Sequence, residues 1–283
     1  MEQEEKRDLN GWVDFLGRAE IPVLKSTIRD LTVLRANPDK VSAGAVADLI
    51  ARDPLMTVRL LRYLQQHKHS KQQRELVQVE QVLLMMGVES FFNKVMPQVL
   101  VEDMLRPHLQ ALVNVLQVIN RSHRASGYAM QWAGKRYDMH FEEVRIAALL
   151  HDIAEILMWC FAPQSMLRIR ELQVRDKHMR SRSAQEEVLG FALMDLQRVL
   201  AKEWALPELL LTLTDAEFAN QPRVRNVLLA VNLARHSANG WDDAALPDDY
   251  AGIAELLNIT PEQVMVMIEA EAGIACDISK PHA

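Results

Sequence analysis

The chain has 283 residues, of which 49% are hydrophobic, so it is long enough for one large or two modest domains and too apolar for a disordered protein. Its formal net charge of -6 disfavours a dedicated nucleic-acid binder, because binding along a phosphate backbone usually needs a basic surface. The two cysteines, Cys160 and Cys276, form no C-x-x-C motif and are expected to be small core residues in a reducing compartment.

The N-terminal stretch MEQEEKRDLNGW is charged and lacks the apolar core of a secretory signal, which predicts a cytoplasmic protein. The longest apolar-rich stretch, residues 146–162, contains His151, Asp152 and Glu155. A membrane span needs about 20 apolar residues with few charges. This stretch is therefore predicted to be one buried helix, and no membrane association is expected.

Apolar residues recur at every third or fourth position along most of the chain, which is typical of amphipathic helices. Glycine is scarce, and no sustained alternation of apolar and polar residues indicates a strand. The helical spacing is clearest in residues 45–53, 56–66, 198–213 and 223–237. The sequence predicts an all-α fold, a multi-helix bundle of about a dozen helices with short connections.

Three helix-start signals support this prediction. Asp53-Pro54 places an N-cap residue before a proline at the first helical position. Ser183 with Glu186, and Thr260-Pro261 with Gln263, fit capping boxes.

Two stretches are predicted to interrupt the helices. Residues 67–75 (HKHSKQQRE) contain no apolar side chain and predict a loop. Residues 238–250 hold Gly240, Pro247 and four aspartates, which predicts a connector to a small C-terminal helical piece at 251–273.

Four segments in this order resemble the HDOD domain, a bacterial signalling relative of the metal-dependent HD phosphohydrolases. The first two segments, 21–66 and 77–95, carry family positions at Pro22, Leu24, Asn37-Pro38, Ile50, Asp53-Pro54, Arg59-Leu60-Leu61, Val77, Val79, Val82, Leu84, Gly87 and Asn93. The others are AALLHDIAEILM (147–158) and EEVLGFALMDLQRVLAKEWALPELL (186–210), so the resemblance spans residues 15–220.

The resemblance implies three parts: an N-terminal helical HDOD subdomain (1–105), an HD-like helical subdomain (106–240) and a small C-terminal extension (241–283). It also implies bacterial signal transduction, often beside cyclic-di-GMP circuits. This chain lacks the fused domains of many family members, so a signalling protein is expected to be its partner in trans. A nucleotide second messenger is the second partner class considered.

The metal site of the parent superfamily needs more than the adjacent pair His151 and Asp152. Neighbouring residues on a helix point about 100° apart, and an open catalytic metal site normally has at least three protein ligands. The resemblance places a further His about thirty residues earlier, at the position of Arg121. His123 lies two residues on, about 200° around the helix, and is a ligand only in a different register.

The remaining family ligand positions carry other residue types. One expected His falls on Leu193, a His-His pair falls near Asp215, Ala216 and Glu217, and the final Asp falls on Arg235. Arginine cannot deprotonate to bind a metal. His151, Asp152, Arg121 and Arg235 are therefore interpreted as the remnant of an HD site, with no metal or other cofactor expected.

Buried polar groups need partners, and a guanidinium of Arg121 in the vacated metal position is a candidate for Asp152. The prediction is a non-catalytic regulatory module that binds a protein. The alternative is a divergent metal-dependent phosphohydrolase or phosphodiesterase using His151, Asp152 and His123 with a divalent metal.

The segment MLRIRELQVRDKHMRSR (166–182) is locally basic. Such a run is most often the solvated face of a helix, and Glu171 and Asp176 are interspersed in it. An acidic partner or a nucleotide is the functional interpretation of the same residues.

Overall fold

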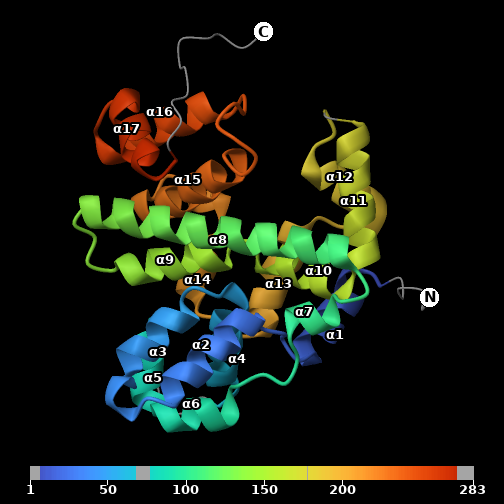
Figure 1. Cartoon of the computed structure of the whole chain (residues 1–283). Helices are drawn as coiled ribbons and strands as arrows, with labels where there is room; N and C mark the ends of the chain where they lie inside the picture. Colours follow the sequence, from blue (N-terminus) through green and yellow to red (C-terminus); the bar gives the residue numbers. More distant parts are fainter. Residues whose placement is uncertain (1–6, 68–76, 177, 273–283) are drawn as a thin grey trace. The chain divides into compact units, whose positions relative to one another are not determined.

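The structure, a computed structural model, describes residues 7–67, 77–176 and 178–272. These residues form seventeen α-helices, two short 3-10 helices and one isolated parallel bridge between Val23 and Leu100, with no strand of greater length (Figure 1). The predicted all-α class is confirmed. The helices outnumber the predicted dozen because several are short, such as the four-residue helix α7 (Val101–Met104). The predicted loop at 67–75 lies, apart from His67, outside the described residues, as does Cys276.

The contacts of the chain group into two compact units, Met1–Asn120 with Asp152–Leu211, and Arg121–His151 with Thr212–Ala283. The three-part division at residues 105 and 240 stays a prediction. The first unit begins with α1 (Leu9–Arg18), α2 (Lys25–Arg35), η1 (Pro38–Lys40), α3 (Ala43–Ile50), α4 (Pro54–Gln66), α5 (Val79–Met86), α6 (Val88–Lys94) and α7. It continues with the first part of α8 (Leu109–Lys135), then α10 (Ile153–Phe161), α11 (Pro163–Arg175), α12 (Ser181–Leu189), α13 (Leu193–Glu203) and most of α14 (Glu208–Leu213).

Helix α4 shows how local signals and packing combine in the first unit. The Asp53 carboxylate caps it by accepting hydrogen bonds from the backbone N–H groups of Leu55 (2.9 Å) and Met56 (3.2 Å), as predicted. Its apolar face is fully buried, and α3 packs against α2, α4 and α5. Arg59 extends from α4 and donates to the carbonyl oxygens of Ile21 (3.0 Å) and Val95 (2.6 Å). An arginine at a matched family position therefore ties the segment before α2 to the C-terminal end of α6.

The second unit contains the rest of α8 together with α9 (Phe141–Leu150), η2 (Ala216–Phe218), α15 (Pro222–His236), α16 (Leu246–Leu257) and α17 (Pro261–Ala272). Helix α15 packs against α9 and α16, and α16 packs against α17. The predicted box at the start of α17 is confirmed. Gln263 Oε1 accepts from Thr260 N (2.9 Å), and Thr260 Oγ1 accepts from Gln263 N (3.3 Å).

Two other helix boundaries correct the predictions. Ser183 is not an N-cap, because α12 begins at Ser181 and Glu186 instead pairs with Arg182 one turn before it, at 2.8 Å. The connector predicted at 238–250 ends five residues early. Helix α16 already begins at Leu246, with Pro247 in its first turn, where a missing N–H costs nothing.

The apolar stretch 146–162 is not one helix. It is divided between α9 and α10 at His151 and Asp152. Cys160 on α10 is buried, and burial raises the pKa of its thiol, so it is the small core residue expected. Within the described residues no single helix is long and apolar enough to cross a membrane; 141–161 with 163–175, bent by 113°, pass that test only as a pair.

Candidate functional site

The pair His151 and Asp152 lies at a corner of the chain. His151 keeps helical backbone angles (φ -55°, ψ -39°) after the last residue of α9, whereas Asp152 departs from them (φ -104°, ψ 24°) before α10 begins. The side chains are almost completely buried, with 5% and 8% of their surface exposed. The 100° separation expected within one helix therefore does not apply to this pair.

The N-terminus of α10 is capped by a residue that is distant in sequence. The Asp152 side chain accepts no capping hydrogen bond from α10. Instead Oε1 of Gln197, from α13, accepts a 2.8 Å hydrogen bond from the backbone N–H of Ala154. Gln197 is itself buried, so this bond satisfies one of the helix's free N–H groups away from water. The role of Gln197 was not predictable, because no short-range pattern links residues 43 positions apart.

The boundary between the two units falls between the members of the pair. Asp152 belongs to the first unit, and His151 to the second. Arg121, His123 and Arg235 also belong to the second unit, where Arg121 is half-buried and the other two are exposed. The two members of the pair and these three residues each interact with other residues through the side chain or the backbone, so none is without a partner. The pairing of Arg121 with Asp152 stays a prediction.

The other family ligand positions have local structural roles. Leu193 is buried as the first residue of α13. Asp215 caps η2, because its carboxylate accepts a 3.0 Å hydrogen bond from the backbone N–H of Glu217. Among the described residues, no group of three or more His, Cys, Asp and Glu side chains is arranged to hold a metal ion. The described donors therefore do not fit the divalent metal site that the resemblance to HD phosphohydrolases implies.

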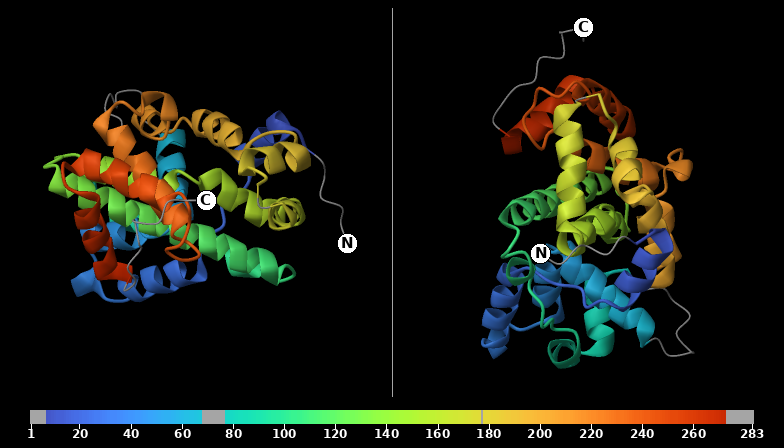
Figure 2. Two further views of the ribbon diagram at one scale, coloured as in Figure 1. Left: turned by 90° about the horizontal axis from the view of Figure 1, so that it is seen from above. Right: turned by 90° about the vertical axis from the view of Figure 1, so that its right-hand side faces the viewer.

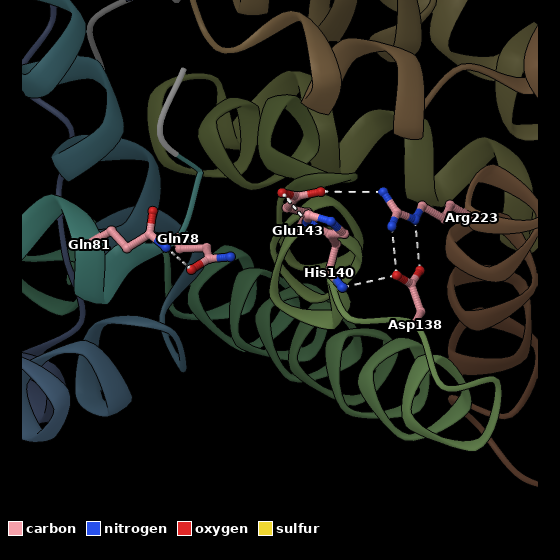
Figure 3. Close-up of polar contacts among 6 residues, drawn as sticks. All are labelled: Gln78, Gln81, Asp138, His140, Glu143 and Arg223. Atoms are coloured by element: carbon pink, nitrogen blue, oxygen red, sulfur yellow. Dashed lines mark hydrogen bonds and ion pairs between the residues drawn. The ribbon is translucent and has the colours of Figure 1, made fainter. Parts of the chain in front are cut away.

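A charged cluster in the second unit joins the turn between α8 and α9 to the start of α15 (Figure 3). The Arg223 guanidinium donates to both carboxylate oxygens of Asp138, from Nε at 2.8 Å and from Nη2 at 2.7 Å. Its Nη1 lies 3.5 Å from Glu143 Oε2, and His140 Nδ1 lies 3.1 Å from Glu143 Oε1. Two planar groups joined by parallel hydrogen bonds hold this turn in one geometry.

The charge state of Asp138 follows from the same contacts. Burial raises the pKa of this carboxyl, but hydrogen bonds from Arg223 and from the His140 backbone outweigh burial and leave the pKa below its ordinary value. Asp138 is therefore ionised at neutral pH and pairs with Arg223 as a carboxylate. The charged groups of the cluster pair with one another, which indicates a structural role.

A second polar pair ties α15 to α16. His236 Nδ1 lies 2.6 Å from Asp249 Oδ2, next to the exposed Arg235. Burial raises the pKa of Asp249, while the hydrogen bond with His236 opposes the rise. Neither pair was found from sequence, because their members come from different elements and form no recognisable spacing.

The chain resembles known proteins in sequence and in fold. The HDOD domain family model matches residues 21–219. The solved structure of the MmoQ response regulator of Methylococcus capsulatus str. Bath aligns with a TM-score of 0.65 at 17% identity, covering 89% of this chain and 99% of that protein. A virulence factor of Campylobacter jejuni subsp. jejuni aligns with a TM-score of 0.64 at 18% identity, covering 96% and 94% of the two chains.

No curated protein matches the chain. At these identities the two solved structures establish the shared fold alone. The family match covers well over half of the 283 residues and contains the segments that carried the resemblance. The chain belongs to the HDOD domain family.

Proposed function

We propose that this HDOD protein is a regulatory module of bacterial signal transduction that binds a protein partner and does not turn over a substrate. The observation that carries the proposal is the donor set around the corner at residues 151–152. His151 and Asp152 supply two donors, and among the described residues no third His, Cys, Asp or Glu completes a group with them. A catalytic divalent site needs about three protein ligands and an open position for water.

Burial supports the same proposal. Both side chains are more than nine-tenths covered, and the neighbouring N-terminus of α10 is satisfied by Gln197 within the protein. A hydrolytic centre needs room for a substrate phosphate and for the attacking water. A corner filled by protein side chains is suited to packing and hydrogen bonding instead. The name of the MmoQ protein, a response regulator, agrees with a signalling role.

Metal analysis of the purified protein tests the proposal. We expect no stoichiometric Mn, Fe, Ni or Mg, and no hydrolysis of bis(p-nitrophenyl) phosphate or cyclic-di-GMP when these metals are added. The variants are Asp152→Ala and, as the matched control, Asp48→Ala, which removes an exposed carboxylate from α3 of the same unit.

A phosphohydrolase would give a different pattern. Stoichiometric metal that Asp152→Ala removes and Asp48→Ala retains, together with metal-dependent hydrolysis, would overturn the proposal. Because Asp152→Ala can also disturb a buried corner, circular dichroism of each variant accompanies the metal measurement. Metal bound by the wild type at one equivalent or more, with turnover, contradicts the proposal even if that variant fails to fold.

A further inference from the structure

The basic segment 166–182 is unusual in this acidic protein. It holds six Lys and Arg residues against two acidic residues, a local net charge of +4 in a chain whose net charge is -6. The structure places most of it on α11 and on the start of α12, two helices of the first unit that pack side by side (Figures 1 and 2). Most of the described residues of the segment therefore lie on two helices that pack together.

Helix α11 has a buried side and a grooved side. Met166 and Ile169 are buried. The opposite side borders an open groove with a volume of about 360 Å³, lined by Gln164, Leu167, Arg168, Glu171, Leu172 and Arg175. These positions recur at intervals of three and four residues, so they form one continuous stripe along the helix. We call this stripe the α11 groove.

The arginines of the α11 groove are available to a partner. Among the described residues, no hydrogen bond or ion pair is recorded for Arg168 or Arg175, both of which are exposed. Glu171 lies three residues after one and four before the other, a spacing that permits intrahelical ion pairs, yet neither pair forms. Elsewhere exposed arginines of this chain do pair, as Arg182 does with Glu186 at 2.8 Å.

We propose that the α11 groove docks an acidic amphipathic helix of the protein partner; this rests on the function proposed above. Arg168 and Arg175 lie seven residues apart, which is two turns and about 10 Å along α11. They face carboxylates seven residues apart on a helix that lies along the groove. Leu167 and Leu172 also line the groove and contact the apolar side of that helix. In helix-in-groove recognition, an amphipathic helix lays its apolar face against apolar anchors of the groove.

The groove suits a peptide better than a nucleic acid. Glu171 lies between the two arginines, so a continuous phosphate backbone would meet a carboxylate at the centre of the stripe. A partner helix can place an uncharged or basic residue opposite Glu171 and acidic residues at both ends. The alternating charges of the stripe therefore favour a partner whose own charges alternate in the complementary order. A phosphate chain carries a negative charge at every repeat and cannot match Glu171.

Binding of a designed peptide to the 283-residue chain tests the proposal. The probe is a fluorescein-labelled helix of about 18 residues, five turns, with leucines on one face and glutamates seven residues apart beside them. A scrambled peptide of the same composition and a copy with lysine for glutamate are its controls. The protein variants are Arg168→Glu with Arg175→Glu, and Arg170→Glu, which reverses an exposed arginine about 200° around the same helix.

We expect the probe to bind the wild type more tightly than either control peptide, with an affinity that falls as salt is added. The double variant should weaken binding at least about tenfold, equivalent to about 1.4 kcal/mol, whereas Arg170→Glu should change it less than about twofold. Fluorescence anisotropy measures both effects. All three arginines are exposed, so the variants are expected to fold, which circular dichroism checks.

Three results would overturn the inference: equal binding of the scrambled peptide, an equal loss in Arg170→Glu, or binding of cyclic-di-GMP or an oligonucleotide at Arg168 and Arg175 in place of the peptide. The same preparations are assayed for hydrolysis of bis(p-nitrophenyl) phosphate. Hydrolysis in that assay would overturn the proposed non-catalytic function. The peptide measurements would still show independently whether the α11 groove binds an acidic helix. The two failures are thus distinguishable.

Discussion

Replacing Asp53 with alanine should lower the free energy of unfolding by about 2–3 kcal/mol. One carboxylate oxygen accepts from the N–H groups of Leu55 and Met56 at the start of α4. The other accepts from the Thr27 hydroxyl at 2.8 Å and, more weakly, from the N–H of Leu24 at 3.4 Å. Asp53 is 1% exposed, so water cannot replace these bonds.

The magnitude follows from the groups that lose their acceptor. Loss of an N-cap costs about 1–2 kcal/mol, and a buried hydroxyl such as that of Thr27 left without a partner costs about 1–2 kcal/mol. Against this, burial raises the pKa of Asp53, with the hydrogen bonds from Thr27 and the backbone opposing the rise. The native carboxylate therefore carries a desolvation cost that alanine removes, which places the net loss below the sum of the two terms.

Urea denaturation followed by circular dichroism measures the effect. Asp53→Asn is the matched control, because it keeps one carbonyl oxygen and the volume, and we expect it to lose about half as much as alanine. A change of less than about 0.5 kcal/mol for Asp53→Ala would refute the reasoning, since that is the range of ordinary surface substitutions. Asn as costly as Ala would also refute it.

The pH dependence of the free energy of unfolding of the same variants tests the direction of the pKa shift of Asp53. Since the pKa of Asp53 is raised in the folded state above 3.8, the folded protein holds this proton more tightly than the unfolded chain. The contribution of this group to stability is thus greatest at low pH and falls as the pH rises through the folded value. The deficit of Asp53→Asn relative to wild type should accordingly shrink with rising pH; a deficit that grows would contradict the burial argument.

Arg223→Ala, which removes both hydrogen bonds to Asp138, should cost about 1–3 kcal/mol at neutral pH. The pKa of Asp138 is lowered from 3.8, so this cost should persist above that pH and disappear as the pH falls through the folded value; urea curves showing a pH-independent deficit would contradict it. Gly127→Ala on α8, where an added Cβ meets nothing within 4 Å, should stabilise the protein by up to about 1 kcal/mol. Gly252→Ala on α16 should increase stability less than Gly127→Ala, because its Cβ would lie 2.8 Å from Leu229 Cδ2. Equal increases in Tm for the two variants would show that the contact with Leu229 has no effect.

Features that depend on a few neighbouring residues were predictable. The cap at Asp53 and the box between Thr260 and Gln263 are formed by groups two or three residues apart, and the structure confirms both. Ser183 satisfied the same local rule but lies inside α12. The rule fails there because the helix begins two residues before Ser183, which therefore lies within the first turn and cannot be the N-cap.

The corner at His151 and Asp152 shows where local patterns end. Apolar spacing continues through residues 146–162, so the sequence predicted one helix, yet the backbone leaves helical angles at Asp152. Gln197 on α13 accepts the N–H of Ala154 and so supplies the cap that a new helix start requires. That bond depends on a partner 43 residues away, which no window of a few turns contains.

The sequence by itself determined the all-α class, the order of most helices, the family and the location of the His-Asp pair, because helical periodicity and family motifs are properties of contiguous residues. Only the tertiary structure decided that the pair lies at a corner and that Asp138 and Arg223 form a two-point ion pair across 85 positions. It alone decided that one side of α11 borders a groove lined by the exposed Arg168 and Arg175. Contacts of this kind arise from the packing of whole helices. The neighbours that packing places beside a charged side chain decide whether it binds a partner or stabilises the fold.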